Sequence, residues 1–185
     1  MSKLLWVFSR LRSSMHTCGH SRYLLGALLL LGSAARVRQY LAQSSYWHDE
    51  AYLLLNVFPK SFFELVGPLS HEQAAPPLFL WLLRASYLAL GPSELAMRLP
   101  ALLASLATLG FMAPLARLTV GGRSWLWAVA CAAVSSSLLY LTCQVKPYTT
   151  DVLVAEAVLL ATVGCLMPGL SNGWRRASHV GLLLA

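Results

Sequence analysis

The chain has 185 residues, which is enough for one domain and too few for two large ones. Hydrophobic residues make up 57% of the chain and charged residues only 11%, whereas an ordinary soluble domain carries about 25% charged residues. So few charges cannot cover a water-exposed surface. The composition therefore excludes soluble globular and disordered proteins and leaves an integral membrane protein. The net charge of +7 does not indicate a nucleic-acid partner, because the basic residues lie between apolar runs and form no single patch.

The N-terminal segment 1–22 is predicted to be a basic cytoplasmic tail, since it carries four basic residues and no acid. Within this tail His16, Cys18 and His20 lie close together. A closed metal site usually takes four ligands from spaced pairs, so we expect a solvated tail and no metal there. The four cysteines of the chain contain no CxxC pair, which indicates neither a disulfide framework nor a zinc knuckle.

Apolar runs predict an all-α, polytopic membrane domain over residues 23–185. Four runs approach the length that a membrane-spanning helix needs, namely 23–41, 99–116, 125–143 and 152–167. A fifth run begins at residue 178 and stops at 185, so we expect the N-terminal part of a longer protein or a truncated product. For the first run the alternative is a signal peptide, because Ser33-Ala34-Ala35 is typical of a cleavage site.

The apolar segment 76–90 is too short to be an obvious span. If it does not cross, the short connections that carry Arg117, Arg123, Arg175 and Arg176 lie in the cytoplasm, as the positive-inside rule favours. We therefore expect a juxtamembrane helix. Residues 42–98 then form one extracytoplasmic loop, and the connection 144–151 lies on the same side of the membrane.

Five of the seven acids lie in this loop, and two of them, Asp49 and Glu50, are adjacent within the sequence Tyr46-Trp47-His48-Asp49-Glu50. Ionisable groups next to a bilayer are costly to desolvate and often mark a functional site. Asp49 is a candidate general base toward a hydroxyl or amine nucleophile. The alternative is a hydrated acidic pair beside an aromatic belt.

Two further polar clusters belong to the same predicted side. In residues 71–77, His71 and Gln73 are candidates for binding a polar headgroup, and the Pro-Pro pair predicts an extended entry into the following helix. In residues 144–151, Lys146 is a candidate phosphate ligand, accompanied by Tyr148 and Asp151. The alternatives are a helix start and an interfacial turn.

Together these stretches resemble the membrane glycosyltransferases of the protein O-mannosyltransferase and aminoarabinose-transferase type. The stretches that match are YWHDEA at 46–51, HEQAAPPLFLWLL at 71–83, GPSELAMRLPALLASLATL at 91–109 and QVKPYTTD at 144–151. The resemblance implies a GT-C-like fold of about four complete spans plus a truncated fifth, with juxtamembrane helices in the first extracytoplasmic loop. It also implies that Asp49 is the catalytic acid and Glu50 its companion.

Such enzymes pass a sugar from a polyprenyl-phosphate carrier to a lipid, glycan or protein at the extracytoplasmic face of the cell membrane. Besides Lys146, the cations Arg36, Arg38 and Arg98 are candidates for offsetting the charge of the leaving phosphate. Relatives commonly have Arg where this chain has Lys146, which implies a phosphate contact without a bidentate grip. No cofactor is expected, and the sequence leaves open whether the reaction uses a divalent metal. The rival functions are an inactive remnant and a transporter or scaffold, although a transporter favours polar groups at mid-span.

Overall fold

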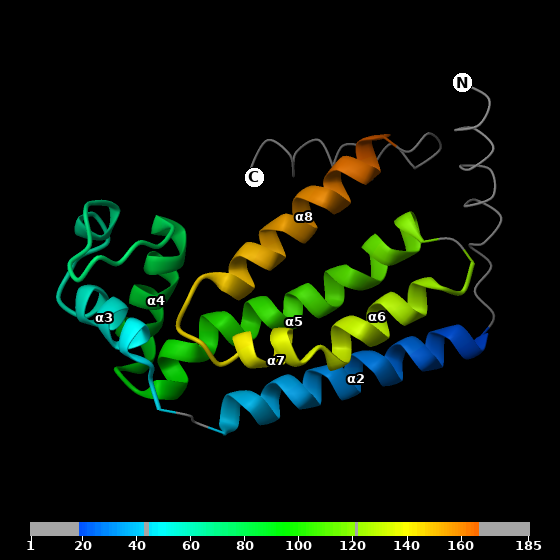
Figure 1. Ribbon diagram of the computed structural model, residues 1–185, viewed down its shortest axis with the longest axis horizontal. Helices are drawn as coiled ribbons and strands as arrows, with labels where there is room; N and C mark the ends of the chain where they lie inside the picture. Colours follow the sequence, from blue (N-terminus) through cyan, green and yellow to red (C-terminus); the bar gives the residue numbers. More distant parts are fainter. Residues whose placement is uncertain (1–18, 43–44, 121, 167–185) are drawn as a thin grey trace. The chain divides into compact units, whose positions relative to one another are not determined.

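The computed structural model describes residues 19–42, 45–120 and 122–166 (Figure 1). Over these residues the chain forms helices and no strands, in agreement with the predicted all-α class. The helices, in chain order, are α2 (Gly19–Leu41), α3 (His48–Val57), the 3-10 helix η2 (Glu64–Val66), α4 (Pro77–Leu90), α5 (Glu94–Thr119), α6 (Trp125–Val134), α7 (Ser136–Leu141) and α8 (Tyr148–Leu166).

Within the described ranges, two helices are long and apolar enough to cross a membrane, α5 and α8. These correspond to the predicted runs 99–116 and 152–167, each extended toward its N-terminus. Helix α2 covers the predicted run 23–41 and has 23 residues, but its three arginines make it less apolar than α5 and α8. The predicted half-span 178–185 and the tail residues His16 and Cys18 lie outside the described residues.

The predicted uninterrupted helix over 125–143 is not observed. Helix α6 ends at Val134, Ser135 takes a ψ of 114°, and the short helix α7 follows. The break falls at the start of Ser135-Ser136-Ser137. Serine hydroxyls compete with the helix for backbone hydrogen bonds, which explains why an apolar run of the right length does not form one helix.

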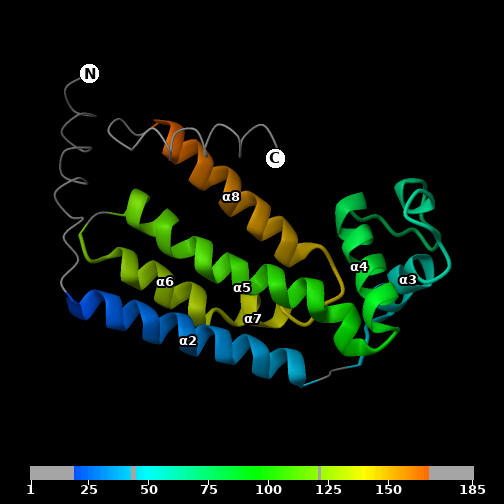
Figure 2. The same cartoon turned by 180° about the vertical axis from the view of Figure 1, so that it is seen from behind.

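The chain divides into two compact units, and each is described by itself. The first comprises Met1–Ser33, Ala107–Ser135 and Val152–Ala185. In its described part, α2, α5 and α6 lie side by side in both views (Figures 1 and 2) around a cluster formed by Ala113, Ala116, Trp125, Leu126 and Val129. Small residues let the helices approach closely. A Cβ added at Gly32 would lie 2.8 Å from Leu109 Cδ2 and 3.0 Å from Ala133 Cβ.

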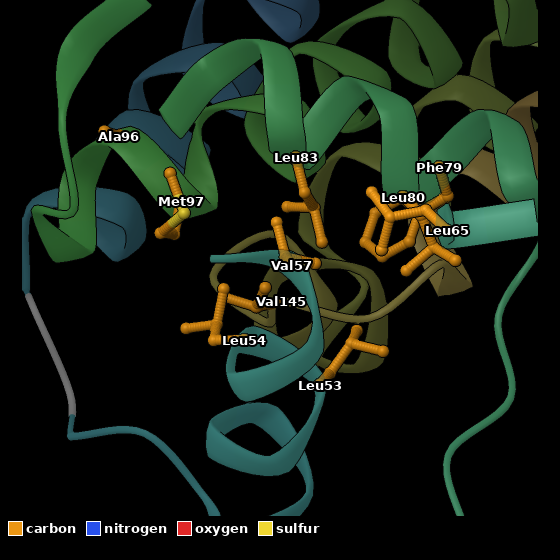
Figure 3. Packing of buried hydrophobic residues seen from close by; sticks show 10 residues of the cluster. All are labelled: Leu53, Leu54, Val57, Leu65, Phe79, Leu80, Leu83, Ala96, Met97 and Val145. Carbon is orange, nitrogen blue, oxygen red and sulfur yellow. The ribbon is translucent and has the colours of Figure 1, made fainter. Parts of the chain in front are cut away.

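The second unit comprises Ala34–Leu106 and Ser136–Asp151. Its core joins α3, η2, α4 and the start of α5 to Val145, through ten buried side chains (Figure 3): Leu53, Leu54, Val57, Leu65, Phe79, Leu80, Leu83, Ala96, Met97 and Val145. Helices α3 and α4 contact each other directly. This core connects the loop 42–98 to the distant segment around Val145.

Helix α4 is the short helix predicted for the loop. Pro76 is extended, with a ψ of 135°, and Pro77 occupies the first turn, where its missing N–H is not needed. Arg84 of α4 then donates from Nη1 to the carbonyl oxygens of Val57 (3.2 Å) and Phe58 (2.6 Å). These carbonyls end α3, so Arg84 caps that helix and holds the two helices in register.

Candidate active site around Asp49 and Lys146

The acidic pair stands in the first turn of α3. Asp49 and Glu50 occupy helical positions where negative charge is favoured by the helix dipole. The backbone N–H of Trp47, the N-cap residue, donates to Glu50 Oε2 at 2.9 Å. The glutamate therefore satisfies one of the N–H groups that a helix start leaves without an intrahelical partner.

A pocket of about 300 Å³ lies at this end of α3, entirely within the second unit. Its lining comes from the α3 start and from the segment 140–148: Trp47, His48, Asp49, Glu50, Tyr140, Gln144, Lys146 and Tyr148. Asp49 is exposed into this space and Lys146 is half-buried. The structure thus gathers four of the predicted site residues, two acids, one cation and one tyrosine, around a single cavity.

Lys146 is held by a side chain from a third part of the loop. Its Nζ donates to Gln73 Oε1 at 2.9 Å, so the predicted residue Gln73 reaches the site through Lys146. Gln73 Nε2 in turn donates to the carbonyl oxygen of His71 at 3.2 Å. His71 is exposed, and its ring stacks on Tyr52 of α3, with centroids 5.0 Å apart and 14° between the planes. His71 does not line the pocket.

Glu50 differs from its neighbour Asp49 in its surroundings. Only 3% of Glu50 is exposed, and its Oε1 accepts the backbone N–H of Val145 at 2.5 Å. Asp49 is exposed. Both acids line the pocket, but the carboxylate of Glu50 is bound to backbone N–H groups, whereas the side chain of Asp49 is exposed.

Two of the predicted phosphate ligands are buried away from this pocket. Arg36 has no exposed surface and donates from Nε to Ser105 Oγ at 2.9 Å, and Ser105 Oγ also pairs with Thr142 at 2.8 Å. Arg98 is 1% exposed and lies 5.0 Å from the Tyr46 ring centroid. Neither arginine lines the pocket, so neither is positioned to contact a phosphate bound there.

Arg98 also forms an ion pair with Glu94, at 3.5 Å. Tyr46 shares this surrounding, and burial raises the pKa of its phenol to about 12, with Arg98 opposing the shift and Glu94 and Glu50 adding to it. The Tyr46 hydroxyl is buried and has no hydrogen-bond partner among the described residues. Tyr46 therefore stays neutral over the whole physiological range and acts as an aromatic surface for Arg98.

Two more predicted ligands are exposed but lie outside the pocket lining. Arg38 stands in the last turn of α2, and Asp151 in the first turn of α8, with its N–H bonded to the carbonyl oxygen of Pro147. Their assignment as substrate ligands stays a prediction.

Four pocket residues were not among the predicted site residues. Trp47, His48 and Gln144 lie inside the stretches that carry the family resemblance, so their neighbours in sequence pointed to them. Tyr140 had no such signal, because it lies within the run predicted to be one uninterrupted span. The helix break at Ser135 separates α7 from α6 and adds Tyr140 to the second unit. Over the described residues no three His, Cys, Asp or Glu side chains gather in a way that suits a metal ion.

Comparison with known protein families supports the predicted relationship. Residues 74–184 match the dolichyl-phosphate-mannose-protein mannosyltransferase family. The chain belongs to this family. The match includes α4, α5 and the segment that carries Lys146, whereas Asp49 and Glu50 precede it. No curated protein and no solved structure matches the chain.

Membership in the mannosyltransferase family makes the chain a relative of membrane-integral glycosyltransferases that use a polyprenyl-phosphate sugar donor. The two apolar helices α5 and α8 agree with a membrane location. The matched stretch also contains Lys146 and Tyr148, two of the residues that line the pocket.

Proposed function

We propose that this chain takes part in transferring a sugar, mannose by the family description, from a polyprenyl phosphate to a lipid, glycan or protein acceptor at the extracytoplasmic face. One observation carries the proposal: an exposed carboxylate, Asp49, and a cation, Lys146, line the same pocket although they come from distant parts of the sequence. An exposed acid and a cation that face one cavity are the two groups that transfer of a sugar from a phosphate needs.

The pocket contains the groups that the reaction needs. The acceptor oxygen forms a bond to the anomeric carbon of the donor while the bond from that carbon to the phosphate oxygen breaks. Asp49 takes the acceptor's proton as a general base. The lipid phosphate leaves with the bonding electron pair, and Lys146 offsets the negative charge that develops on it. Tyr148 and Gln144 supply hydrogen-bonding groups for the sugar or the phosphate.

The extracytoplasmic location is supported by charge. The short connections on the opposite side of the predicted spans hold Arg117, Arg123, Arg175 and Arg176, as the positive-inside rule favours for the cytoplasmic side. The acceptor-binding face would then be open to the outside, and the lipid-linked donor would enter from the membrane.

The test is transfer from radiolabelled polyprenyl-phosphate mannose by the whole chain in proteoliposomes, with a membrane extract as the source of acceptors. Asp49→Asn is close to isosteric, so the protein should insert and fold, but transfer should fall by about 10²- to 10⁴-fold because Asn cannot accept the proton. Lys146→Ala should mainly raise the KM for the donor.

The matched control is Glu64→Gln, which neutralises an exposed carboxylate that does not line the pocket. It should leave transfer unchanged. Near-normal turnover by Asp49→Asn would show that Asp49 is not the general base. A wild-type chain that is inserted in the membrane but consumes no donor would contradict the proposed function itself.

A further inference from the structure

Glu50 links two parts of the site that are far apart in sequence. Its two carboxylate oxygens each accept a backbone N–H, Oε2 from Trp47 at 2.9 Å and Oε1 from Val145 at 2.5 Å. The second bond connects residues 95 positions apart. Hydrogen bonds from backbone N–H groups to a buried carboxylate are among the stronger ones, because one partner is charged.

The bond to Glu50 involves the residue directly before Lys146, namely Val145. The Val145 side chain has no exposed surface and packs into the core of the second unit, in the same cluster as Leu54 and Val57 (Figure 3). Its neighbours Gln144 and Lys146 both line the pocket. With the Val145 side chain anchored in the core and its N–H anchored on Glu50, the backbone that carries Lys146 has little freedom to move.

The other end of Lys146 is also held. Gln73 Oε1 accepts from Lys146 Nζ at 2.9 Å. Gln73 follows His71 and Glu72, two consecutive non-glycine residues with positive φ angles, 61° and 54°. Such residues are strained and persist only where the surroundings impose them, which is common at functional sites. Here the stacking of His71 on Tyr52 is one such constraint.

A proton-transfer role for Glu50 fits these contacts poorly. A general base has to reach the acceptor's proton directly or through one water, whereas Glu50 is 3% exposed and both of its oxygens already accept backbone N–H groups. Its contacts lead to the segment of Lys146, which in the proposed function is the donor side of the pocket.

We infer that Glu50 is a positioning residue for the donor side of the site: through the Val145 amide it fixes the segment 144–147 so that Lys146 meets the leaving phosphate. It acts as a buried acceptor of two backbone hydrogen bonds and exchanges no proton with the acceptor. Gln73 completes the positioning at the amino group of Lys146. The kinetic part of this inference rests on the proposed function, and the structural part does not.

The experiment uses Glu50→Gln and Glu50→Met in the whole chain. Glutamine keeps the size of the side chain but has only one acceptor oxygen, so one of the two backbone N–H groups would face an NH₂ group and lose its partner. Glu50→Met, which is similar in size and has no acceptor oxygen, removes the partner of both N–H groups, so hydrogen exchange at Val145 should become faster in this variant. With polyprenyl-phosphate mannose as the donor, the donor KM of Glu50→Met should rise by roughly tenfold, the effect of losing the charge-assisted contact between Lys146 and the phosphate. The acid limb of the pH–rate profile should be unchanged.

Double variants distinguish positioning from a general loss of structure. In Glu50→Met/Lys146→Ala the donor KM should be close to that of Lys146→Ala alone, because Glu50 acts through Lys146. The matched control is Glu94→Gln, which removes a part-buried acid paired with Arg98 in the same unit but outside the pocket. Its effect should add to that of Lys146→Ala. Gln73→Ala, which removes a loop side chain and leaves the core intact, should raise the donor KM in the same non-additive way.

Three results would overturn the inference. Unchanged exchange at Val145 in Glu50→Met would show that the bond does not hold the segment. Faster exchange with an unchanged donor KM would show that the segment does not serve the donor. A lower kcat with loss of the acid limb would make Glu50 a proton-transfer group. If Glu50→Met does not fold, additive effects of Gln73→Ala and Lys146→Ala contradict positioning of Lys146. A wild-type chain without transfer would contradict the proposed function, whereas the exchange measurement would still test the bond.

Discussion

The close approach of α2 to its neighbours in the first unit can be tested by adding one methyl group. In Gly32→Ala the new Cβ would lie 2.8 Å from Leu109 Cδ2, 3.0 Å from Ala133 Cβ and 3.3 Å from Ala133 Cα. The Leu109 methyl is the end of a flexible side chain and can turn away. Ala133 Cα is a backbone atom of α6 and Ala133 Cβ is bonded to it, so neither can turn away. To remove these close contacts, α2 and α6 have to separate by a few tenths of an ångström.

The expected cost follows from this geometry. Overpacking of this kind destabilises a protein by about 1–3 kcal/mol, while replacing Gly by Ala within a helix favours folding by roughly 0.5–1 kcal/mol. Gly26 is the matched control, because it lies on the same helix and in the same unit and a Cβ there would meet nothing within 4 Å. Gly26→Ala carries only the favourable change, so the two variants should differ by about 1–3 kcal/mol in the free energy of unfolding.

The assay is unfolding by sodium dodecyl sulfate in mixed micelles, followed by far-ultraviolet circular dichroism. The unfolding midpoint of Gly32→Ala should lie below that of the wild type, and the midpoint of Gly26→Ala should equal or exceed it. Close packing through small residues is a general way of joining helices in membranes. Equal midpoints for the two variants would refute the close approach of α2 to α6 at Gly32.

Two further predictions concern the ionisation of Tyr46 and the membrane topology. The pKa of Tyr46 is raised from 10.0 to about 12 by burial. Its contribution to stability is therefore fully present below pH 10 and is lost as the pH rises toward 12. When unfolding midpoints are compared between pH 9 and 12, this part of the alkaline loss of stability should be absent in Tyr46→Phe. The predicted topology puts Lys60 outside and position 121 inside, so single cysteines at 60 and 121, in a variant whose native cysteines are replaced, should react with an impermeant thiol reagent from opposite sides. Reaction of both from one side would refute that topology.

Several local features of this protein follow from its sequence alone. Apolar runs predicted the helices that became α5 and α8, since hydropathy and length are properties of a continuous segment. The Pro-Pro pair predicted the extended entry and the start of α4 at Pro77, because proline restricts its own backbone and that of the preceding residue. The acidic pair Asp49-Glu50 and the segment around Lys146 were also recognisable as polar groups between apolar runs, and their order along the chain indicated the family.

The roles of individual side chains depended on the tertiary structure. From the sequence, Glu50 is predicted to be a companion of Asp49. In the structure, packing buries Glu50 against the Val145 amide and leaves Asp49 exposed to the pocket. The sequence indicates Arg36 and Arg98, besides Lys146, as candidate phosphate ligands, and of these three only Lys146 lines the pocket. Helix caps and hydropathy depend on residues that are close together in the sequence. The environments of Glu50 and Lys146 depend instead on partners from distant segments, up to 95 residues away, that packing brings within about 3 Å. The buried core that contains Leu54 and Val145 determines which distant segments meet, and a local sequence pattern does not predict that packing.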